Sequence, residues 1–269
     1  MRAMRDRREL AGAWSRFQSH GFAAAHPDLS GVITRYWWAR WDLRDQPDYA
    51  QLIVPYPNVQ LTFTTTEPAM IRGVARGRVR RTLSGRGAVL AVTFRPGVFR
   101  RFLRAPVSSI TDRAVPATRV FGPHLPPLPA ATLTTTPDPA EVLPPLIESL
   151  ERFLLAHRPP PDPPGDEVAS WAEVIAATPA LRRVDHLTAH FGPGERRLQR
   201  LFAEHVGVSP KWVLRRFRLH EVTERMAARD AAINWAVLAA DLGYADQAHL
   251  IRDFTAMFGE SPTSYAARY

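Results

Sequence analysis

The feature that most restricts the fold of this chain is an internal repeat. Residues 198–210 (LQRLFAEHVGVSP) and 250–262 (LIRDFTAMFGESP) share six of thirteen residues at identical offsets, without a gap. Each copy follows a short apolar segment that ends in Gly192 or Gly243. Glycine readily adopts the positive φ at which many helices end. We therefore predict that each unit forms a helix, a tight turn and a second helix.

The apolar residues of the repeat indicate how each second helix packs. They recur at helical spacing on one face and should contact the first helix of their unit. These residues are Leu198, Leu201 and Phe202 in the first copy and Leu250, Phe254 and Phe258 in the second. Ser209-Pro210 and Ser261-Pro262 predict the starts of further helices, with Ser as the N-cap and Pro in the first turn. The helix after Ser209 is long enough to hold the two units at a fixed separation.

The part of the chain before residue 159 has a different pattern. β-branched and aromatic runs, separated by Pro, Gly, Asp and Asn, predict strands near 32–43, 59–66, 76–83 and 88–94. A turn at Pro96-Gly97 should open a short basic helix. Residues 140–158 carry apolar side chains at helical spacing, and we expect this helix to pack on the N-terminal part. The alternative is a contact between two copies of the chain.

A proline-rich segment separates these two parts. Residues 158–165 read RPPPDPPG, and prolines disfavour helices and central strands. We therefore predict an α+β multidomain chain. It has a mostly β N-terminal domain at 1–158 with a short helix, a linker at 159–165, and an all-α domain at 166–269 with two helix-turn-helix units joined by a long helix. Because few contacts should cross the linker, the N-terminal domain is expected to fold by itself.

Composition excludes several classes of protein. The chain has no Cys, which excludes a disulfide framework, a thiol nucleophile and a thiolate metal site. No run of about eighteen apolar residues and no signal peptide is found, so a cytoplasmic location and no membrane partner are expected. The formal net charge is +9, but residues 165–269 hold 13 basic and 13 acidic residues, so the excess lies upstream. No nucleotide-binding loop or pair of catalytic carboxylates stands out, so we expect no enzyme.

The second helix-turn-helix unit carries a specific run of residues. It consists of Gly243-Tyr244, Asp246-Gln247-Ala248-His249-Leu250, Arg252, Phe254, Phe258-Gly259-Glu260-Ser261-Pro262 and Tyr265. With Leu198-Gln199-Arg200-Leu201-Phe202 in the first unit, this run resembles the paired helix-turn-helix domain of the AraC family of bacterial transcription regulators. The resemblance covers residues 182–269. The chain departs from the family's motif at Ala248 and Leu250, and Gly194 stands where Ser is common.

The N-terminal part carries a less specific resemblance. Leu83-Ser84-Gly85-Arg86-Gly87 and Phe94-Arg95-Pro96-Gly97 resemble an uncharacterised module of some AraC-type regulators. By analogy with the family, this module senses an effector or dimerises. The resemblance therefore implies an unidentified small-molecule effector, a second copy of the chain and RNA polymerase as partners, beside double-stranded DNA.

The resemblance also implies which residues contact DNA. Helices 194–206 and 246–258 would enter successive major-groove faces about one helical turn apart. The candidate DNA-binding residues are Arg196, Arg197, Gln199 and Arg200 in the first unit and Asp246, Gln247, His249 and Arg252 in the second. Arg side chains hydrogen-bond well to guanine, and Gln side chains to adenine. The alternative for each candidate residue is contact with phosphate or with solvent only. For Asp246 we favour an N-cap role, and Arg215, Arg216 and Arg218 are expected to be structural or phosphate-facing.

These observations together predict a sequence-specific, nucleoid-associated transcription regulator that needs no cofactor. The alternative is an architectural DNA-binding protein of low specificity. A DNA-repair enzyme with the same DNA-binding domain would need an acceptor Cys, which the chain lacks. The two units also differ in charge: residues 182–220 hold nine basic and three acidic residues, and residues 221–269 hold four basic and seven acidic residues. Phosphate attraction is therefore expected mainly from the first unit.

Other groups of residues have plainer interpretations. His186 and His190 lie four residues apart, but no third ligand is evident and no metal site is expected. Alternating arginines could form an anion pocket, although a solvated strand face is favoured; they are Arg76, Arg78 and Arg80. An aromatic cluster could line a ligand cavity, although core packing is favoured; it comprises Tyr36, Trp37, Trp38 and Trp41.

Overall fold

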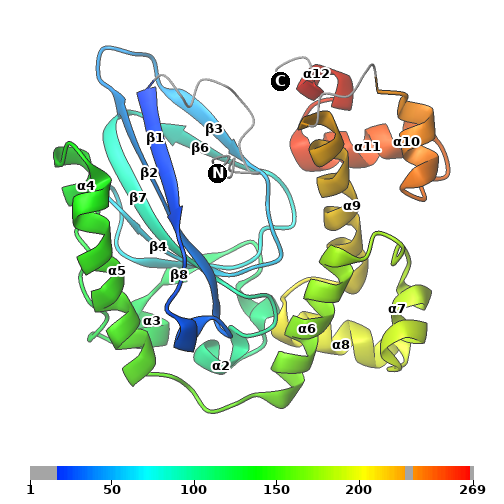
Figure 1. Ribbon diagram of the computed structural model, residues 1–269, viewed down its shortest axis with the longest axis horizontal. Helices are drawn as coiled ribbons and strands as arrows, with labels where there is room; N and C mark the ends of the chain where they lie inside the picture. The colour runs from blue at the N-terminus through cyan, green and yellow to red at the C-terminus, as the bar shows by residue number, and fades with distance from the viewer. Residues whose placement is uncertain (1–16, 228–232, 267–269) are drawn as a thin grey trace.

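A β-rich N-terminal part and an all-helical C-terminal part make up the chain (Figure 1). The computed structural model describes residues 17–227 and 233–266. The N-terminal part is built on a six-stranded antiparallel sheet. Its strands, in spatial order, are β1 (Gln18–Ala23), β2 (Ile33–Leu43), β7 (Gly85–Phe94), β4 (Gln60–Thr64), β5 (Met70–Arg72) and β8 (Ala114–Pro116). A two-stranded ribbon pairs β3 (Tyr49–Ile53) with β6 (Val79–Leu83). The predicted α+β multidomain fold is confirmed.

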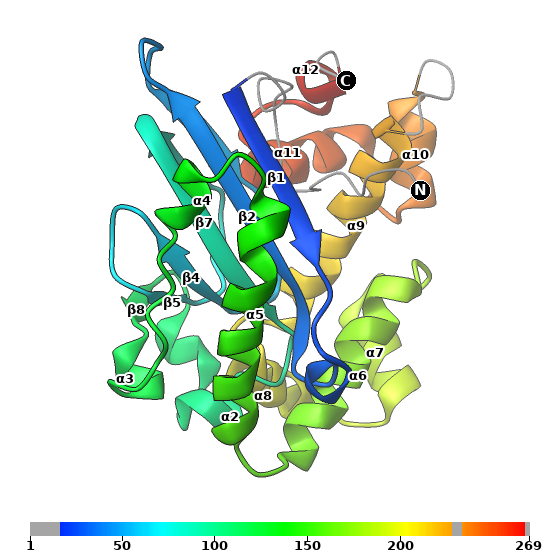
Figure 2. The same ribbon diagram turned by 60° about the vertical axis from the view of Figure 1, so that its left-hand side comes forward.

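The two faces of the six-stranded sheet meet different surroundings, because successive side chains of a strand point to opposite faces. On one face, Tyr36, Leu61 and Leu90 belong to a buried core that includes α5 (Pro139–Ala156). Figure 2 shows α5 lying along this face. The predicted packing of this helix on the N-terminal part is confirmed, since its buried residues in this core are Leu143, Ile147, Leu150, Phe153 and Leu154.

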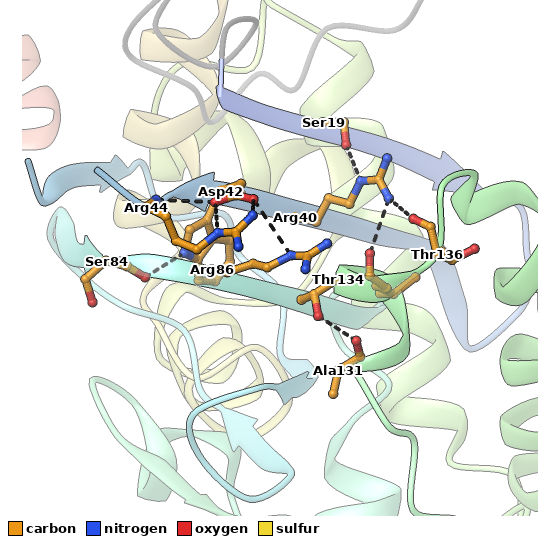
Figure 3. A network of polar contacts seen from close by, with 11 residues as sticks. Ser19, Arg40, Asp42, Arg44, Ser84, Arg86, Ala131, Thr134 and Thr136 are labelled. Atoms are coloured by element: carbon orange, nitrogen blue, oxygen red, sulfur yellow. Dashed lines mark hydrogen bonds and ion pairs between the residues drawn. The ribbon is translucent and has the colours of Figure 1, made fainter. Parts of the chain in front are cut away.

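Arg40 of β2 fixes the segment that leads into α5. Its Nε donates to Ser19 Oγ at 2.8 Å, and its Nη1 donates to the Thr136 carbonyl at 2.6 Å. Figure 3 shows this guanidinium between β1 and the residues that follow α4 (Thr132–Thr135). Asp138 then caps α5, because its Oδ1 accepts the Ala140 N–H at 2.9 Å. The start of α5 is therefore tied to the edge of the sheet.

Four further short helices lie in the segments between and after the strands of the sheet. They are η1 (Pro27–Leu29), α2 (Arg100–Leu103), η2 (Val107–Ile110) and α3 (Thr118–Phe121). The turn before α2 has Gly97 at a φ of +91°, so the predicted turn and short basic helix are confirmed. A Cβ at Gly97 would lie 2.7 Å from the backbone nitrogen of Ala169 in α6 (Pro163–Ala177), so this turn needs glycine to approach α6.

The C-terminal part contains the two predicted helix-turn-helix units. Its helices are α6 (Pro163–Ala177), α7 (Val184–Phe191), α8 (Glu195–His205), α9 (Pro210–Ala227), α10 (Trp235–Asp241), α11 (Gln247–Phe258) and α12 (Pro262–Ala266). One core joins α6, α7, α8 and the start of α9, and a second joins α10, α11, α12 and the rest of α9. The predicted helix stops are confirmed, since Gly192 and Gly243 have φ values of +89° and +71°.

The structure corrects the predicted linker at 159–165. Helix α6 begins at Pro163, so the segment without helix or strand covers residues 157–162. Pro163 and Pro164 occupy the first turn of α6, where a helix has no partner for the N–H groups that proline lacks. Prolines at this place therefore start a helix instead of preventing one. The domain limits 1–158 and 166–269 stay predictions.

Contacts between the two parts are more extensive than the sequence predicts. Val54, which follows β3, lies in the core of the second helix-turn-helix unit, and Val74, which follows β5, lies in the core of the first. Arg216 of α9 is 1% exposed, and its Nε donates to the Pro55 carbonyl at 2.5 Å. The expectation that few contacts cross is therefore wrong. The loops after β3 and β5 each contribute a side chain to a core of the helical part.

Candidate nucleic-acid interface

The first candidate recognition helix, α8, has one buried and one exposed face. Leu198, Leu201 and Phe202 are buried in a core with residues of α6, α7 and α9. The predicted DNA-binding residues of this helix are all exposed, namely Arg196, Arg197, Gln199 and Arg200. Because residues three and four apart share a helix face, the packing of Leu198 and Phe202 turns these polar side chains toward solvent.

The second candidate recognition helix, α11, has the same design. Phe254 and Phe258 are buried and stack at 4.1 Å between ring centroids, and Tyr265 of α12 packs edge-on against Phe254 at 5.4 Å. Gln247 and Arg252 are exposed on the opposite side. The structure thus presents a second polar helix face that is fixed by an aromatic core.

The two helices begin differently. Asp246 Oδ1 accepts the His249 N–H at 2.6 Å, so the N-cap role favoured for Asp246 is confirmed. At the start of α8, Gly194 is the N-cap and offers no side-chain acceptor. Replacing a side-chain cap by glycine costs about a few tenths of a kcal/mol, so α8 starts slightly less firmly than α11. Contact of Asp246 with DNA stays a prediction.

Neighbouring acids hold several of the candidate side chains. Gln199 Nε2 donates to Glu195 Oε1 at 2.9 Å, and Arg200 Nη1 lies 3.5 Å from Glu204 Oε2. Both pairs are four residues apart, a spacing at which helical side chains meet. Our sequence reasoning missed Glu195 and Glu204, although this spacing could have identified them. A base edge must compete with these carboxylates for Gln199 and Arg200.

His249 is held in a similar way on α11. Its ring packs edge-on against Tyr244 at 5.1 Å, and its Nε2 lies 3.9 Å from Asp253 Oδ2. Burial raises the pKa of the Tyr244 phenol to about 12, so this ring stays neutral at physiological pH. The His249 side chain is 43% exposed and remains open to solvent. Its orientation is therefore set before any ligand arrives.

The connecting helix α9 anchors the second unit through its arginines. Arg215 Nη2 lies 3.1 Å from Asp253 Oδ1 and also donates to the Asp253 carbonyl at 3.2 Å. The Arg218 guanidinium lies over the Tyr244 ring at 4.7 Å. The structural role predicted for Arg215, Arg216 and Arg218 is therefore confirmed. In Figure 1, α8 and α11 lie toward opposite ends of α9, so this one helix sets their separation.

The C-terminal end of α8 contacts the N-terminal part. Arg100 Nη2 of α2 lies 2.8 Å from Glu204 Oε1, and Thr111 Oγ1 donates to the Gly207 carbonyl at 2.6 Å. His205 is 3% exposed, and its Nδ1 lies 3.4 Å from Asp162 Oδ2. Burial lowers the pKa of the His205 imidazole. The N-terminal part therefore contacts the C-terminal end of the candidate recognition helix α8, while the polar face of α8 stays exposed.

The histidines considered as metal ligands have other contacts. His186 Nδ1 lies 3.2 Å from the Ala180 carbonyl oxygen, and His190 packs edge-on against Phe191 at 4.9 Å. Within residues 17–227 and 233–266, no group of three or more His, Asp and Glu side chains is placed to hold a metal ion. None of the helices in these ranges is long and apolar enough to cross a bilayer.

Two family models match the chain. Residues 187–268 match a model described as a helix-turn-helix domain, which spans the end of α7 through α12. The C-terminal module is an AraC-type helix-turn-helix domain. This AraC-type module makes the chain a DNA-binding transcription regulator, as predicted. Residues 22–116 match a model described as a domain of unknown function (DUF6597), so the predicted uncharacterised N-terminal module is confirmed.

Solved structures of ToxT from Vibrio cholerae are among those that the chain matches. The P21 form has 11% sequence identity and a TM-score of 0.45, covering 94% of this chain and 99% of ToxT. ToxT bound to (E)-4-(8-methylnaphthalen-1-yl)but-3-enoic acid has 9% identity and a TM-score of 0.43, with the same coverage. ToxT bound to an unsaturated fatty acid has 11% identity and a TM-score of 0.38, covering 82% of this chain and 90% of ToxT. No curated protein matches the sequence.

Proposed function

We propose that this regulator reads two successive major-groove segments of one DNA site with α8 and α11. The observation that carries this proposal is the pair of exposed polar helix faces that a single helix, α9, joins. The proposed contacts are made by Arg196, Arg197, Gln199 and Arg200 of α8 and by Gln247, His249 and Arg252 of α11. Asp246 positions the start of α11. The proposed location is the cytoplasm, where the chain associates with the nucleoid, and RNA polymerase and a second copy of the chain stay predicted partners.

The alternative is an architectural protein that binds any duplex. Selection of bound fragments from random duplex DNA decides between the two functions. For a specific reader, the selected site should bind at least about a thousandfold more tightly than a scrambled duplex at the same salt concentration. Equal affinity for selected and scrambled duplexes would support the architectural function and contradict sequence reading.

The first prediction concerns direct reading of bases by α8. Gln199→Ala should weaken binding to the selected site by about 1–3 kcal/mol and change binding to scrambled DNA little, because a base contact exists only at the selected site. Fluorescence anisotropy at fixed salt measures both affinities. Arg158→Ala is the matched control, since Arg158 is exposed and lies before α6. Equal losses on both duplexes would assign the Gln199 side chain to the DNA backbone.

The second prediction concerns the unequal charge of the two units. Residues 182–220 hold nine basic and three acidic residues, whereas residues 221–269 hold four and seven, so phosphate attraction should come mainly from the first unit. Arg196→Ala or Arg200→Ala should flatten the dependence of log K on log salt by about one unit of slope, and Arg252→Ala should flatten it less. Base changes under the first unit should also cost more affinity. An equal fall in slope for all three variants contradicts this order.

The N-terminal module is proposed to regulate DNA binding through its contacts with both units. The loop after β3 reaches the second unit through Val54, and Trp212 of α9 donates its Nε1–H to the Arg76 carbonyl at 2.9 Å. The ring of Tyr56 packs edge-on against Phe217 of α9 at 5.6 Å. These contacts support the proposal, because a shift of either loop changes what α9 packs against. An effector that binds the N-terminal module can change DNA affinity only if it favours one arrangement of these loops and α9 over another.

A further inference from the structure

A cavity of about 710 Å³ lies on the face of the six-stranded sheet opposite α5. The β3–β6 ribbon lines the other side of this cavity, so its walls come from two separate sheets. Alternation along β4 places Thr62 and Thr64 at the cavity, while Leu61 and Phe63 face the core with α5. The volume lies within the range of about 300–1,000 Å³ that is usual for small-molecule sites.

Positive charge dominates the cavity wall. Its charged lining residues are four arginines and one acid, namely Arg72, Arg78, Arg81, Arg113 and Asp112. Asp112 already pairs with the exposed Arg76, whose Nε donates to Asp112 Oδ2 at 2.6 Å. Asp112, the one acid in the lining, pairs with an arginine that does not line the cavity. It therefore leaves the four lining arginines their positive charge, and the cavity favours an anionic ligand.

Arg72 and Arg81 form a double guanidinium site across the cavity walls. Arg72 belongs to β5 and Arg81 to β6, and both contact the carboxylate of Glu67, with Arg81 Nη1 3.3 Å from Oε1. Arg72 Nε also donates to Thr62 Oγ1 at 3.0 Å, which fixes its orientation. Burial, and to a lesser extent the nearby Arg81 charge, lowers the pKa of Arg72. One carboxylate serves two guanidiniums, so a second carboxylate can bind there with charge-assisted hydrogen bonds.

A buried acceptor lies next to this site. Gln51 of β3 is directly opposite Arg81 in the β3–β6 register and lines the same cavity. The residue is 5% exposed, and its Nε2 donates to the Leu52 carbonyl at 3.1 Å. Its Oε1 has no hydrogen-bond partner among the described residues. Because buried acceptors are nearly always paired, this oxygen calls for a donor on the occupant.

Two indoles provide a flat apolar wall. Trp37 and Trp41 are four residues apart on β2 and therefore point to the same face. Trp41 is fixed in place, since its Nε1 donates to the Ser84 carbonyl at 3.2 Å and its ring covers Gly87, where a Cβ would lie 2.3 Å from Cζ2. Aromatic faces of this kind favour planar rings.

We propose that this cavity binds a planar aromatic carboxylic acid that also carries an N–H or O–H donor. The carboxylate binds Arg72 and Arg81, the ring packs against Trp37 and Trp41, and the donor meets Gln51 Oε1. This inference rests on the regulatory role proposed above and names the chemical class of the effector. Because Gln51 and Arg81 are directly opposite, the donor and the carboxylate lie on the same side of the ligand.

Indole-3-acetate is the probe, because it combines a planar ring, a carboxylate and a ring N–H. Each compound is titrated into the full chain, and binding is measured by calorimetry and ligand-observed NMR. The controls are indole-3-acetamide, which lacks the charge, and 1-methylindole-3-acetate, which lacks the donor. The acid should bind at least tenfold more tightly than the amide and severalfold more tightly than the methylated acid. Equal binding of acid and amide, or no binding of the acid, overturns the proposal.

Matched variants assign the contacts. Arg81→Gln should weaken indole-3-acetate binding at least tenfold, whereas Arg80→Gln, one residue along β6 and exposed outside the cavity, should leave it unchanged. In Gln51→Leu, which keeps the side-chain volume, the acid and its methylated form should bind equally. Thermal melting of each variant confirms that it is folded. An Arg81→Gln variant that is folded and binds like Arg80→Gln overturns the assignment.

DNA affinity, measured with and without indole-3-acetate, separates the two proposals. If the acid binds through Arg81 but leaves DNA affinity unchanged, the ligand site stands and the regulatory role fails. If the chain binds its selected DNA site and none of the indole acids, the regulator stands and this ligand class is overturned.

Discussion

Phe254→Ala is expected to lower the free energy of unfolding by about 3–5 kcal/mol. Phe254 is fully buried at the centre of the second unit, between the stacked ring of Phe258 and the edge of Tyr265. Truncation leaves a cavity that these rigid rings cannot fill. Urea denaturation followed by circular dichroism measures the loss. Phe254→Leu keeps most of the volume and should cost less than about 1.5 kcal/mol.

Phe202→Ala provides the matched test in the first unit. Phe202 is equally buried, so its loss of stability should be similar, but its effect on DNA binding should differ. The first unit carries most of the positive charge, so the Phe202 variant should lose affinity for every duplex. The Phe254 variant should keep salt-dependent binding with little preference for the selected site. Loss of all binding in both variants would show that the units do not contribute in this unequal way.

The helical part of the fold was largely predictable because its signals are local. The predicted recognition helices 194–206 and 246–258 correspond to α8 and α11 within a residue or two at each end. Serine caps set the following helices: Trp212 N donates to Ser209 Oγ at 3.2 Å, and Ser264 N donates to Ser261 Oγ at 3.1 Å. Caps and glycine stops involve residues close in sequence, so a single chain reveals them.

The β part was predicted less completely. Four strands were expected near their observed positions, but the short or polar strands β1, β3, β5 and β8 were missed. β5 and β8 have three residues each, too few for an alternating pattern to be recognised. Such strands form because neighbouring strands pair with them, and that pairing depends on distant parts of the chain.

The cavity shows why a site can be visible in the sequence and still be assigned to a partly wrong set of residues. The sequence suggested Arg76, Arg78 and Arg80 as the alternating set, but only Arg78 of these lines the cavity, because β6 begins at Val79 and places Arg81 there instead of Arg80. Arginines occur at both alternating phases, so the pattern alone does not select the inner face. The aromatic cluster divides by the same rule: Tyr36 lies in the core, while Trp37 and Trp41 line the cavity.

Arg216→Ala is expected to lower the free energy of unfolding by roughly 2–4 kcal/mol, because it removes a buried charge-assisted hydrogen bond and a large packed side chain. The Arg216 guanidinium lies 4.9 Å from the Tyr56 ring centroid, and its Nε donates to the Pro55 carbonyl. Arg216→Met keeps much of the packing and isolates the hydrogen bond. Lys211→Ala, exposed on the same helix, is the control and should change stability by less than about 0.5 kcal/mol.

The same variants test how the two modules communicate. Pro55 and Tyr56 line the cavity and contact Arg216 of α9, so Arg216 directly connects the proposed ligand site with the helix that spaces α8 and α11. In Arg216→Met, a cavity ligand should bind as in the unaltered chain but change DNA affinity less, because α9 no longer follows the position of Pro55. Measuring DNA affinity with saturating ligand, in both forms, gives the coupling directly. Unchanged coupling in a folded Arg216→Met variant would place the connection elsewhere, with the Trp212 contact to the Arg76 carbonyl as the next bond to remove.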